Sequence, residues 1–219
     1  MKLLSVNVSQ LTAVDYRGRS VATGIFKMPV AGRVMARRMT LEGDRQADLS
    51  VHGGADKAVY VYPSEHYMTW TQELGQNDLP MGQFGENLTV EGMLEETVHI
   101  GDTFRVGSAL LQVTQPRVPC YKLGLKMGSA RFPKRFLASY RTGYYVRVLE
   151  EGTVGAGDSI ERIGTDPERI TIPQAVRLAF FEQDDVPALK KVLRIQALSQ
   201  DWRTMFQEQL TAITSAKRR

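Results

Sequence analysis

The only cysteine in the sequence, Cys120, lies in a segment that favours a reactive or metal-binding thiol. Residues 115–123 read QPRVPCYKL, so the thiol lies between two cations, Arg117 and Lys122, and beside prolines that restrict the backbone. Neighbouring positive charge favours the thiolate, which is both the nucleophile and the form that binds soft metals. A small buried apolar side chain is the commoner role of a lone cysteine, but that role would require neither the cations nor the rigid turn.

Two further segments carry groups that could contact an anionic or heterocyclic ligand. Residues 51–59 read VHGGADKAV and place paired glycines between His52 and Lys57, so backbone N–H groups could approach an anion there. Residues 84–88 read FGENL, and the Asn87 amide could both donate to and accept from a heterocycle. The alternatives are a plain glycine turn, which an isolated Gly-Gly pair favours, and a turn capped by Asn87.

Other polar motifs are interpreted as structural. Asp44, Asp102 and Asp158 each follow a glycine, and aspartate readily hydrogen-bonds its own nearby backbone in such turns. The three histidines are not closely paired, so we expect no zinc site of the usual kind. Phosphate-binding loops, dinucleotide-binding glycine motifs, nucleophile elbows and Cys-x-x-Cys pairs are absent from the sequence.

Composition and charge restrict the class of protein. The 219 residues include 42% apolar side chains, which suits a packed core, and a net charge of +4 favours an anionic ligand or partner without specifying one. No specific nucleic-acid binding is indicated. No secretory signal and no apolar run long enough to span a bilayer is visible, so we expect a cytoplasmic protein that does not contact a membrane.

The elements expected to position these residues are mostly short strands. From residue 1 to about 164, apolar runs rich in β-branched and aromatic residues are separated by glycines, as in a barrel or sandwich. Examples are 98–106, 109–114 and 144–149. One interrupting helix is expected after Pro63, with apolar residues three and four positions apart: Tyr67, Trp70 and Leu74. A second is expected near 131–140, with a proline in its first turn.

Helical periodicity replaces the strand pattern after about residue 165. Apolar residues recur every three or four positions near the end of the chain: Leu198, Trp202, Phe206, Leu210 and Ile213. Pro173 and Pro187 suit the first turns of two helices, and Asp184 or Asp185 is a plausible N-cap. We therefore expect three short helices in this region.

Taken in chain order, these motifs resemble the MOSC family, and the expected C-terminal helices narrow the resemblance to the YiiM-like group, the hydroxylaminopurine-resistance proteins. The motifs are Glu42-Gly43-Asp44, His52-Gly53-Gly54 with Lys57, residues 84–88, Gly101-Asp102 and residues 116–122. The resemblance covers nearly the whole chain. It implies a mainly β fold with α elements, in which a MOSC-type β-barrel domain (1–164) carries a small three-helix domain (165–219).

The resemblance also implies a function and a site. It implies a molybdenum cofactor (molybdopterin) whose metal is bound by Cys120, the catalytic residue, and a cofactor-binding pocket containing His52, Lys57, Asn87, Arg117 and Lys122. The implied reaction reduces N-hydroxylated small molecules, such as hydroxylaminopurines, to amines, with electrons from a separate reductase.

Two alternatives stay open. A cofactor carrier or sulfur-transfer module, acting through a Cys120 persulfide, would present the same pocket without reductase activity. The apolar stripe of the C-terminal helices could also dock a protein partner or a second copy in a homodimer, although folding onto neighbouring helices is the commoner use of such a stripe.

Overall fold

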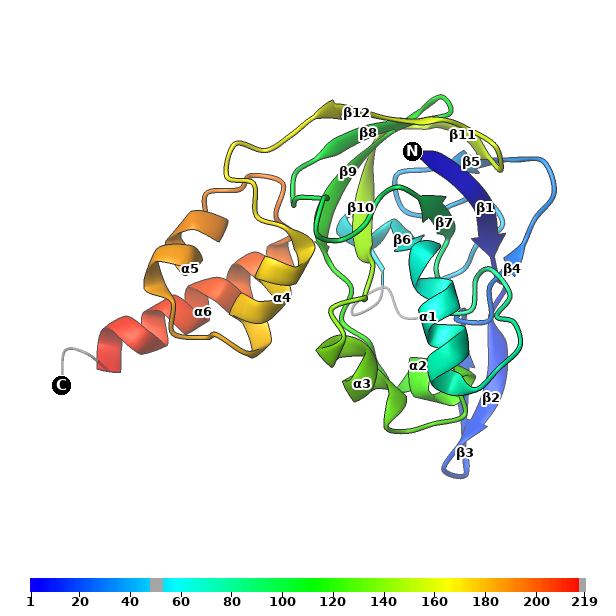
Figure 1. The fold of residues 1–219 in the computed structure, drawn as a ribbon, viewed down its shortest axis with the longest axis horizontal. Helices are drawn as coiled ribbons and strands as arrows, with labels where there is room; N and C mark the ends of the chain where they lie inside the picture. The colour runs from blue at the N-terminus through cyan, green and yellow to red at the C-terminus, as the bar shows by residue number, and fades with distance from the viewer. Residues whose placement is uncertain (48–52, 217–219) are drawn as a thin grey trace.

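The computed structural model describes residues 1–47 and 53–216, which form twelve strands, six α-helices and one short 3₁₀ helix (Figure 1). The strands are β1 (Lys2–Val8), β2 (Thr12–Tyr16), β3 (Arg19–Thr23), β4 (Met28–Pro29), β5 (Arg33–Ala36), β6 (Val59–Pro63), β7 (Leu88–Glu91), β8 (Thr103–Val106), β9 (Ala109–Pro116), β10 (Tyr144–Glu150), β11 (Gly152–Gly155) and β12 (Ile160–Gly164). The helices are η1 (Ala55–Lys57), α1 (Glu65–Leu74), α2 (Tyr121–Lys126), α3 (Phe132–Ala138), α4 (Ile172–Phe180), α5 (Val186–Val192) and α6 (Gln200–Ala216).

Eight strands form the main sheet, in the order β12-β8-β9-β10-β6-β7-β1-β4. Neighbours are antiparallel except β6 and β7, which run parallel. The β-barrel implied by the resemblance is not closed by strand pairing in the described part of the chain, because no continuous ladder joins the two edges of this sheet. The start of β1 meets residues 157–160 only briefly, at the bridge Lys2↔Ser159 and neighbouring backbone hydrogen bonds, before β12 diverges to pair with β8.

Two smaller two-stranded sheets complete the β structure, β11 with β5 and the hairpin of β2 with β3. The hairpin turns at Arg17 and Gly18, whose φ angles of 57° and 76° are both positive. That combination matches the right-handed twist of the strands, which suits a two-residue hairpin loop. The hairpin extends away from the main sheet toward the end of the molecule where α2 lies (Figure 1).

The expected strands and helices are found with three differences. Within 98–106 only β8 is a strand, because Gly101 has a φ of 93° and the Asp102 carboxylate accepts a hydrogen bond from the backbone N–H of His99 (3.0 Å). Helix α2, directly after Cys120, was not expected. Leu198, expected within the last helical stripe, precedes α6.

The helices before β10 enclose an aromatic core of their own. Trp70 of α1 is fully buried, as its spacing predicted, and it donates a hydrogen bond from Nε1 to the hydroxyl of Tyr62 (2.7 Å). The cluster also contains the buried side chains Tyr60, Leu79, Phe84, Leu123, Phe132 and Phe136. Burial of rings of this size is a large apolar contribution to stability, and it fixes α2 and α3 against β6.

Helices α4, α5 and α6 form a group beside the sheet (Figure 1). The N-cap Thr171 of α4 forms a capping box with Gln174, and the Asp185 carboxylate accepts from the backbone N–H of Ala188 (2.9 Å) at the start of α5. Trp202 and Phe206 of α6 are buried in the same core as the sheet.

Among the helices of the described ranges, none combines the length and the apolar composition that crossing a membrane requires. The boundary between residues 164 and 165 remains a prediction.

Candidate functional site

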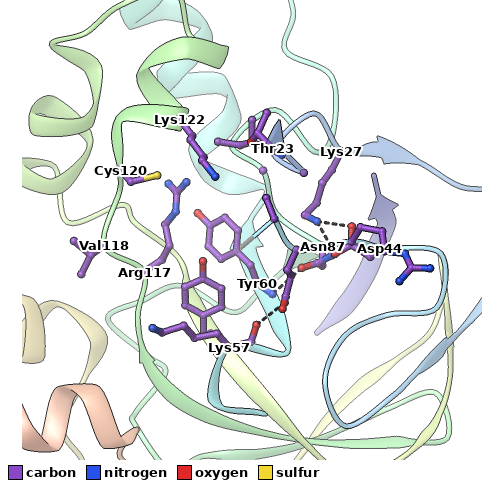
Figure 2. A pocket seen from close by; sticks show the side chains of 17 residues that line it. Thr23, Lys27, Asp44, Lys57, Tyr60, Asn87, Arg117, Val118, Cys120 and Lys122 are labelled. Carbon is purple, nitrogen blue, oxygen red and sulfur yellow. Dashed lines mark hydrogen bonds and ion pairs between the residues drawn. The ribbon is translucent and has the colours of Figure 1, made fainter. Parts of the chain in front are cut away.

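A pocket with about 660 Å³ of empty space, part of it open to solvent, lies where loops from several strands meet α2 (Figure 2). Its walls come from the end of β3 and the following loop, the loop around residue 45, η1, β6, the loop before β7, the β9–α2 connection and β10. The lining residues are Thr23, Gly24, Ile25, Lys27, Asp44, Arg45, Gln46, Ala47, Lys57, Tyr60, Gly85, Asn87, Arg117, Val118, Cys120, Lys122 and Tyr145.

Five of the six predicted site residues line this one pocket: Lys57, Asn87, Arg117, Cys120 and Lys122. The sixth, His52, lies outside the described residues. The five come from three segments that are distant in sequence, so the fold brings together the motifs that the sequence analysis selected. Their roles in ligand binding remain predictions.

Cys120 is half-buried at the start of α2, where the chain leaves β9. Its carbonyl accepts a hydrogen bond from the backbone N–H of Leu123 (3.0 Å), and the fully buried Leu123 side chain anchors the helix in the aromatic core. The helix also packs closely against the segment between α2 and α3, because a Cβ on Gly124 would lie 2.9 Å from the carbonyl oxygen of Ser129. The backbone that carries the thiol is therefore held firmly at the pocket wall.

Arg117 is a buried cation beside this thiol. Its guanidinium carbon lies 4.9 Å from the ring centre of Tyr60 and 5.4 Å from that of Phe136, within cation–π distance of both. Burial lowers the pKa of Arg117, but its interactions with Tyr60, Tyr145 and Cys120 together raise that pKa above its ordinary value. Its Nη1 atom is buried and has no hydrogen-bond acceptor among the residues that the structure describes. A buried donor of this kind is costly unless an acceptor reaches it.

Tyr60 and Tyr145 form an aromatic part of the pocket wall. Their ring centres are 5.4 Å apart, and the Tyr60 hydroxyl donates a hydrogen bond to the carbonyl oxygen of Thr142 (2.7 Å). Burial raises the pKa of Tyr60 well above its ordinary value, although Arg117 opposes the shift, so the phenol stays protonated. The wall is thus apolar in its rings and cationic where Arg117 lies on the ring of Tyr60.

Two lysines of α2 bind backbone carbonyls of β3, of the loop that follows it and of the loop before β7. Lys122 Nζ donates to the carbonyl oxygen of Ala22 (3.1 Å), and Lys126 Nζ donates to the carbonyls of Ile25 (3.1 Å) and Gly82 (2.5 Å). Burial, with smaller contributions from other nearby cations, lowers the pKa of Lys126 to about 8, and Glu86 opposes that shift. These bonds hold the helix that follows Cys120 against the opposite wall.

A buried ion pair forms the side of the pocket away from Cys120 (Figure 2). Lys27 Nζ lies 2.6 Å from both carboxylate oxygens of Asp44, and Asn87 Nδ2 donates to Asp44 Oδ2 (2.9 Å). Asn87 Oδ1 accepts from the backbone N–H of Tyr60 (3.1 Å). Burial lowers the pKa of Lys27, whereas Asp44 raises it. Asn87 therefore holds the wall together through both ends of its amide.

The Lys27–Asp44 pair was not predicted, and the Glu86 carboxylate was not among the predicted site residues. Asp44 is expected in a turn, and Lys27 belongs to no motif. Their pairing could not be predicted because it depends on how distant segments fold together. Glu86 is completely buried and accepts hydrogen bonds from the N–H groups of Gly82 (2.8 Å) and Phe84 (3.0 Å). The glycine-punctuated loop at residues 84–88 is the sequence signal that points to this buried, hydrogen-bonded carboxylate.

Family models match most of the chain. A model described as the MOSC domain matches residues 48–161, and one described as the YiiM-like, 3-alpha helix domain matches residues 170–212. The first range contains the β9–α2 connection with Cys120, and the second contains α4 and α5 with most of α6.

Individual proteins agree with these matches. The chain is 43% identical over 204 residues to the uncharacterized protein YflK of Bacillus subtilis (strain 168), covering 93% of this chain and 92% of that protein. It is 37% identical over 146 residues to a protein named reductase from Gibberella moniliformis (strain M3125 / FGSC 7600), covering 65% of this chain but 26% of that protein. The crystal structure of YiiM from Geobacillus stearothermophilus superposes with a TM-score of 0.82 at 33% identity, covering 95% and 98% of the two chains. The chain with this pocket and these three C-terminal helices belongs to the MOSC family, in its YiiM-like group.

Proposed function

We propose that this chain binds a molybdenum cofactor in the pocket, with Cys120 as a ligand to the metal, and reduces N-hydroxylated compounds such as hydroxylaminopurines to amines. One observation carries the proposal: the chain's single thiol lines a cavity beside the buried Arg117, whose Nη1 has no acceptor in the described ranges. Membership of the MOSC family supports it, because MOSC domains generally bind this cofactor. The relative named reductase supports the reaction type.

The residues present suit such a ligand. The pocket is a hollow open to solvent, with cations, an amide and aromatic rings in its lining, and small-molecule sites combine such polar and aromatic groups. A thiolate is a soft ligand appropriate to a metal bound through sulfur. Arg117, Lys57 and Lys122 supply cationic donors for phosphate and pterin oxygens, and the guanidinium offers the planar geometry that such oxygens favour. His52 completes the proposed set on the strength of the family resemblance.

The reaction needs two electrons and two protons. An N-hydroxylated compound, R–NHOH, takes them up and yields the amine R–NH₂ and water, as the N–O bond breaks. The cofactor supplies the redox chemistry when it is bound, and the protein supplies position and electrostatics. Cys120 would hold the metal, the three cations would offset the negative charge of the cofactor, and Asn87 would keep the wall rigid. In this proposal a separate reductase delivers the electrons.

Turnover tests the reductase activity. Protein produced in a cofactor-competent host is supplied with reduced methyl viologen and 6-hydroxylaminopurine, and adenine formation is measured. We expect adenine from wild type and from Val118→Ala, a matched control that changes an apolar pocket residue, and none above background from Cys120→Ser. Loaded wild type that forms no adenine would overturn the reductase proposal.

A mass measurement on the same preparations distinguishes a reductase from a carrier or sulfur-transfer module. With a sulfur donor, a sulfur carrier would gain the mass of one sulfur atom at Cys120, detected on the intact chain. A reductase forms adenine without requiring this adduct. Adduct formation in the absence of turnover would favour the carrier.

A further inference from the structure

The first turn of α6 contacts the turn that places Lys57 in the pocket wall. Lys57 Nζ lies 2.5 Å from Asp201 Oδ2, although 144 positions separate the two residues. The Lys57 side chain is only 12% exposed, whereas Asp201 is 66% exposed. A pocket residue in the part of the chain matched by the MOSC model is therefore paired with a carboxylate supplied by the C-terminal helices.

A second group of bonds fixes the same contact independently of Asp201. The Asp56 carboxylate accepts from the backbone N–H of Gln200 (3.1 Å) and from Arg147 Nη2 (2.8 Å). Arg147 also donates to the carbonyl oxygen of Ala197 (2.8 Å), and the backbone N–H of Ser199 donates to the carbonyl oxygen of Thr114 (3.2 Å). We therefore expect helix α6 to stay docked when the exposed Asp201 carboxylate is removed.

The Lys57–Asp201 pair has two opposing effects on an anion in the pocket. The carboxylate restricts a long side chain that otherwise has many rotamers, and fixing those rotamers in advance favours binding. The same carboxylate reduces the net positive charge. Asp201 limits the rotamers of a side chain that is itself only 12% exposed, whereas the charge of Asp201 is partly screened by solvent. We take the restriction to be the larger effect, and the direction in which Asp201→Asn changes the release rate tests this ranking.

We propose that Asp201 is a positioning residue for the pocket: it holds the Lys57 ammonium where it meets the anionic part of the bound ligand. The C-terminal helices thereby contribute to ligand retention without lining the pocket themselves. This inference rests on the proposed function for the identity of the ligand. It assigns to α6 a role inside its own chain, distinct from docking a partner.

The test follows the release of the cofactor rather than its turnover. Wild type and Asp201→Asn, both purified from a cofactor-competent host, are dialysed at low ionic strength, and molybdenum and pterin per chain are measured over time. We expect roughly five-fold faster loss from Asp201→Asn, the upper end for a partly exposed ion pair, with a melting temperature close to wild type. Asp201→Glu, which keeps the carboxylate, should restore much of the retention.

Two controls make the result specific. Glu208→Gln removes the same charge from an exposed position further along α6 and should release cofactor at the wild-type rate. In a Lys57→Met background, Asp201→Asn should have no further effect, because the two residues act together. Three results would each overturn the inference. They are unchanged or slower cofactor release from Asp201→Asn, equally fast release from Glu208→Gln, and the same effect of Asp201→Asn in the Lys57→Met background.

If Asp201→Asn also lowers the melting temperature, the Asp201→Glu variant separates positioning from loss of stability. Failure of Asp201→Glu to restore cofactor retention would then overturn the inference. Wild type purified without molybdenum would instead overturn the proposed function, and this inference with it.

Discussion

The guanidinium of Arg117 lies over the ring of Tyr60, with its central carbon 4.9 Å from the ring centre, while its Nη1 atom has no acceptor in the ranges that the structure describes. The cation is thus held by aromatic faces rather than by a carboxylate. In the proposed function, the anionic part of the cofactor is the acceptor for this guanidinium. This relationship links the packing of the aromatic core to the chemistry of the pocket.

Replacing Arg117 should reduce cofactor content without destabilising the fold. In Arg117→Met the apolar side chain still fills the space between the rings, and the loss of the cation–π contacts is offset by removal of a buried donor without an acceptor, so we expect a free energy of unfolding close to that of wild type. Molybdenum and pterin per chain should fall about ten-fold or more, since a buried charge-assisted donor is lost. Metal analysis and urea unfolding check both expectations.

Arg117→Lys is the matched variant for this prediction. It keeps the charge but loses the planar group that lies on Tyr60, so we expect an intermediate cofactor content. Wild-type metal content in Arg117→Met would show that the guanidinium does not contact the ligand.

Breaking the buried pair of Lys27 and Asp44 should destabilise the protein. Asp44→Asn leaves the Lys27 ammonium, 8% exposed, without its counter-charge, and we expect the free energy of unfolding to fall by about 3 kcal/mol. Urea unfolding at neutral pH measures the change. Glu150→Gln, which removes the partner of Arg105 from an exposed pair, is the control and should cost less than about 1 kcal/mol. Equal losses in the two variants would contradict the importance of the buried pair.

Stability should depend on pH above neutrality through Lys126. Burial lowers its pKa from 10.5 in the unfolded chain to about 8 in the folded state. Between these values the unfolded chain binds more protons, so the contribution of Lys126 to the free energy of unfolding rises from pH 8 toward pH 10.5 and is lost as the pH falls through 8. The difference in unfolding free energy between wild type and Lys126→Met, measured from pH 7 to 10, should change in this direction. A difference independent of pH would contradict the burial of this ammonium.

Much of the pocket could be predicted from the sequence because its residues lie in short, recognisable motifs. The segment around Cys120, the loop before Lys57 and the loop containing Asn87 each carried a local signal, and their order along the chain matched a family. Helices α1 and α3 to α6 could also be predicted, since apolar spacing, prolines and caps are encoded within each segment.

The remaining features depend on contacts between distant segments. Lys27 and Asp44 are paired only because β1, β4 and the loop before β7 fold together, and Lys57 meets Asp201 across most of the chain. Helix α2 has no clear sequence signal because it spans only six residues and contains Gly124. It is stabilised by the burial of Leu123 and by lysine bonds to backbone carbonyls. The open edge of the main sheet likewise depends on strand register, which composition does not specify.

Molybdenum and pterin content of purified protein tests the proposed cofactor site most directly. Wild type, Val118→Ala and Cys120→Ser are produced in the same cofactor-competent host and analysed for metal and pterin per chain. Near-stoichiometric molybdenum in wild type and Val118→Ala, with none above background in Cys120→Ser, is the predicted result. Wild type without molybdenum, or Cys120→Ser with the wild-type amount, would contradict it.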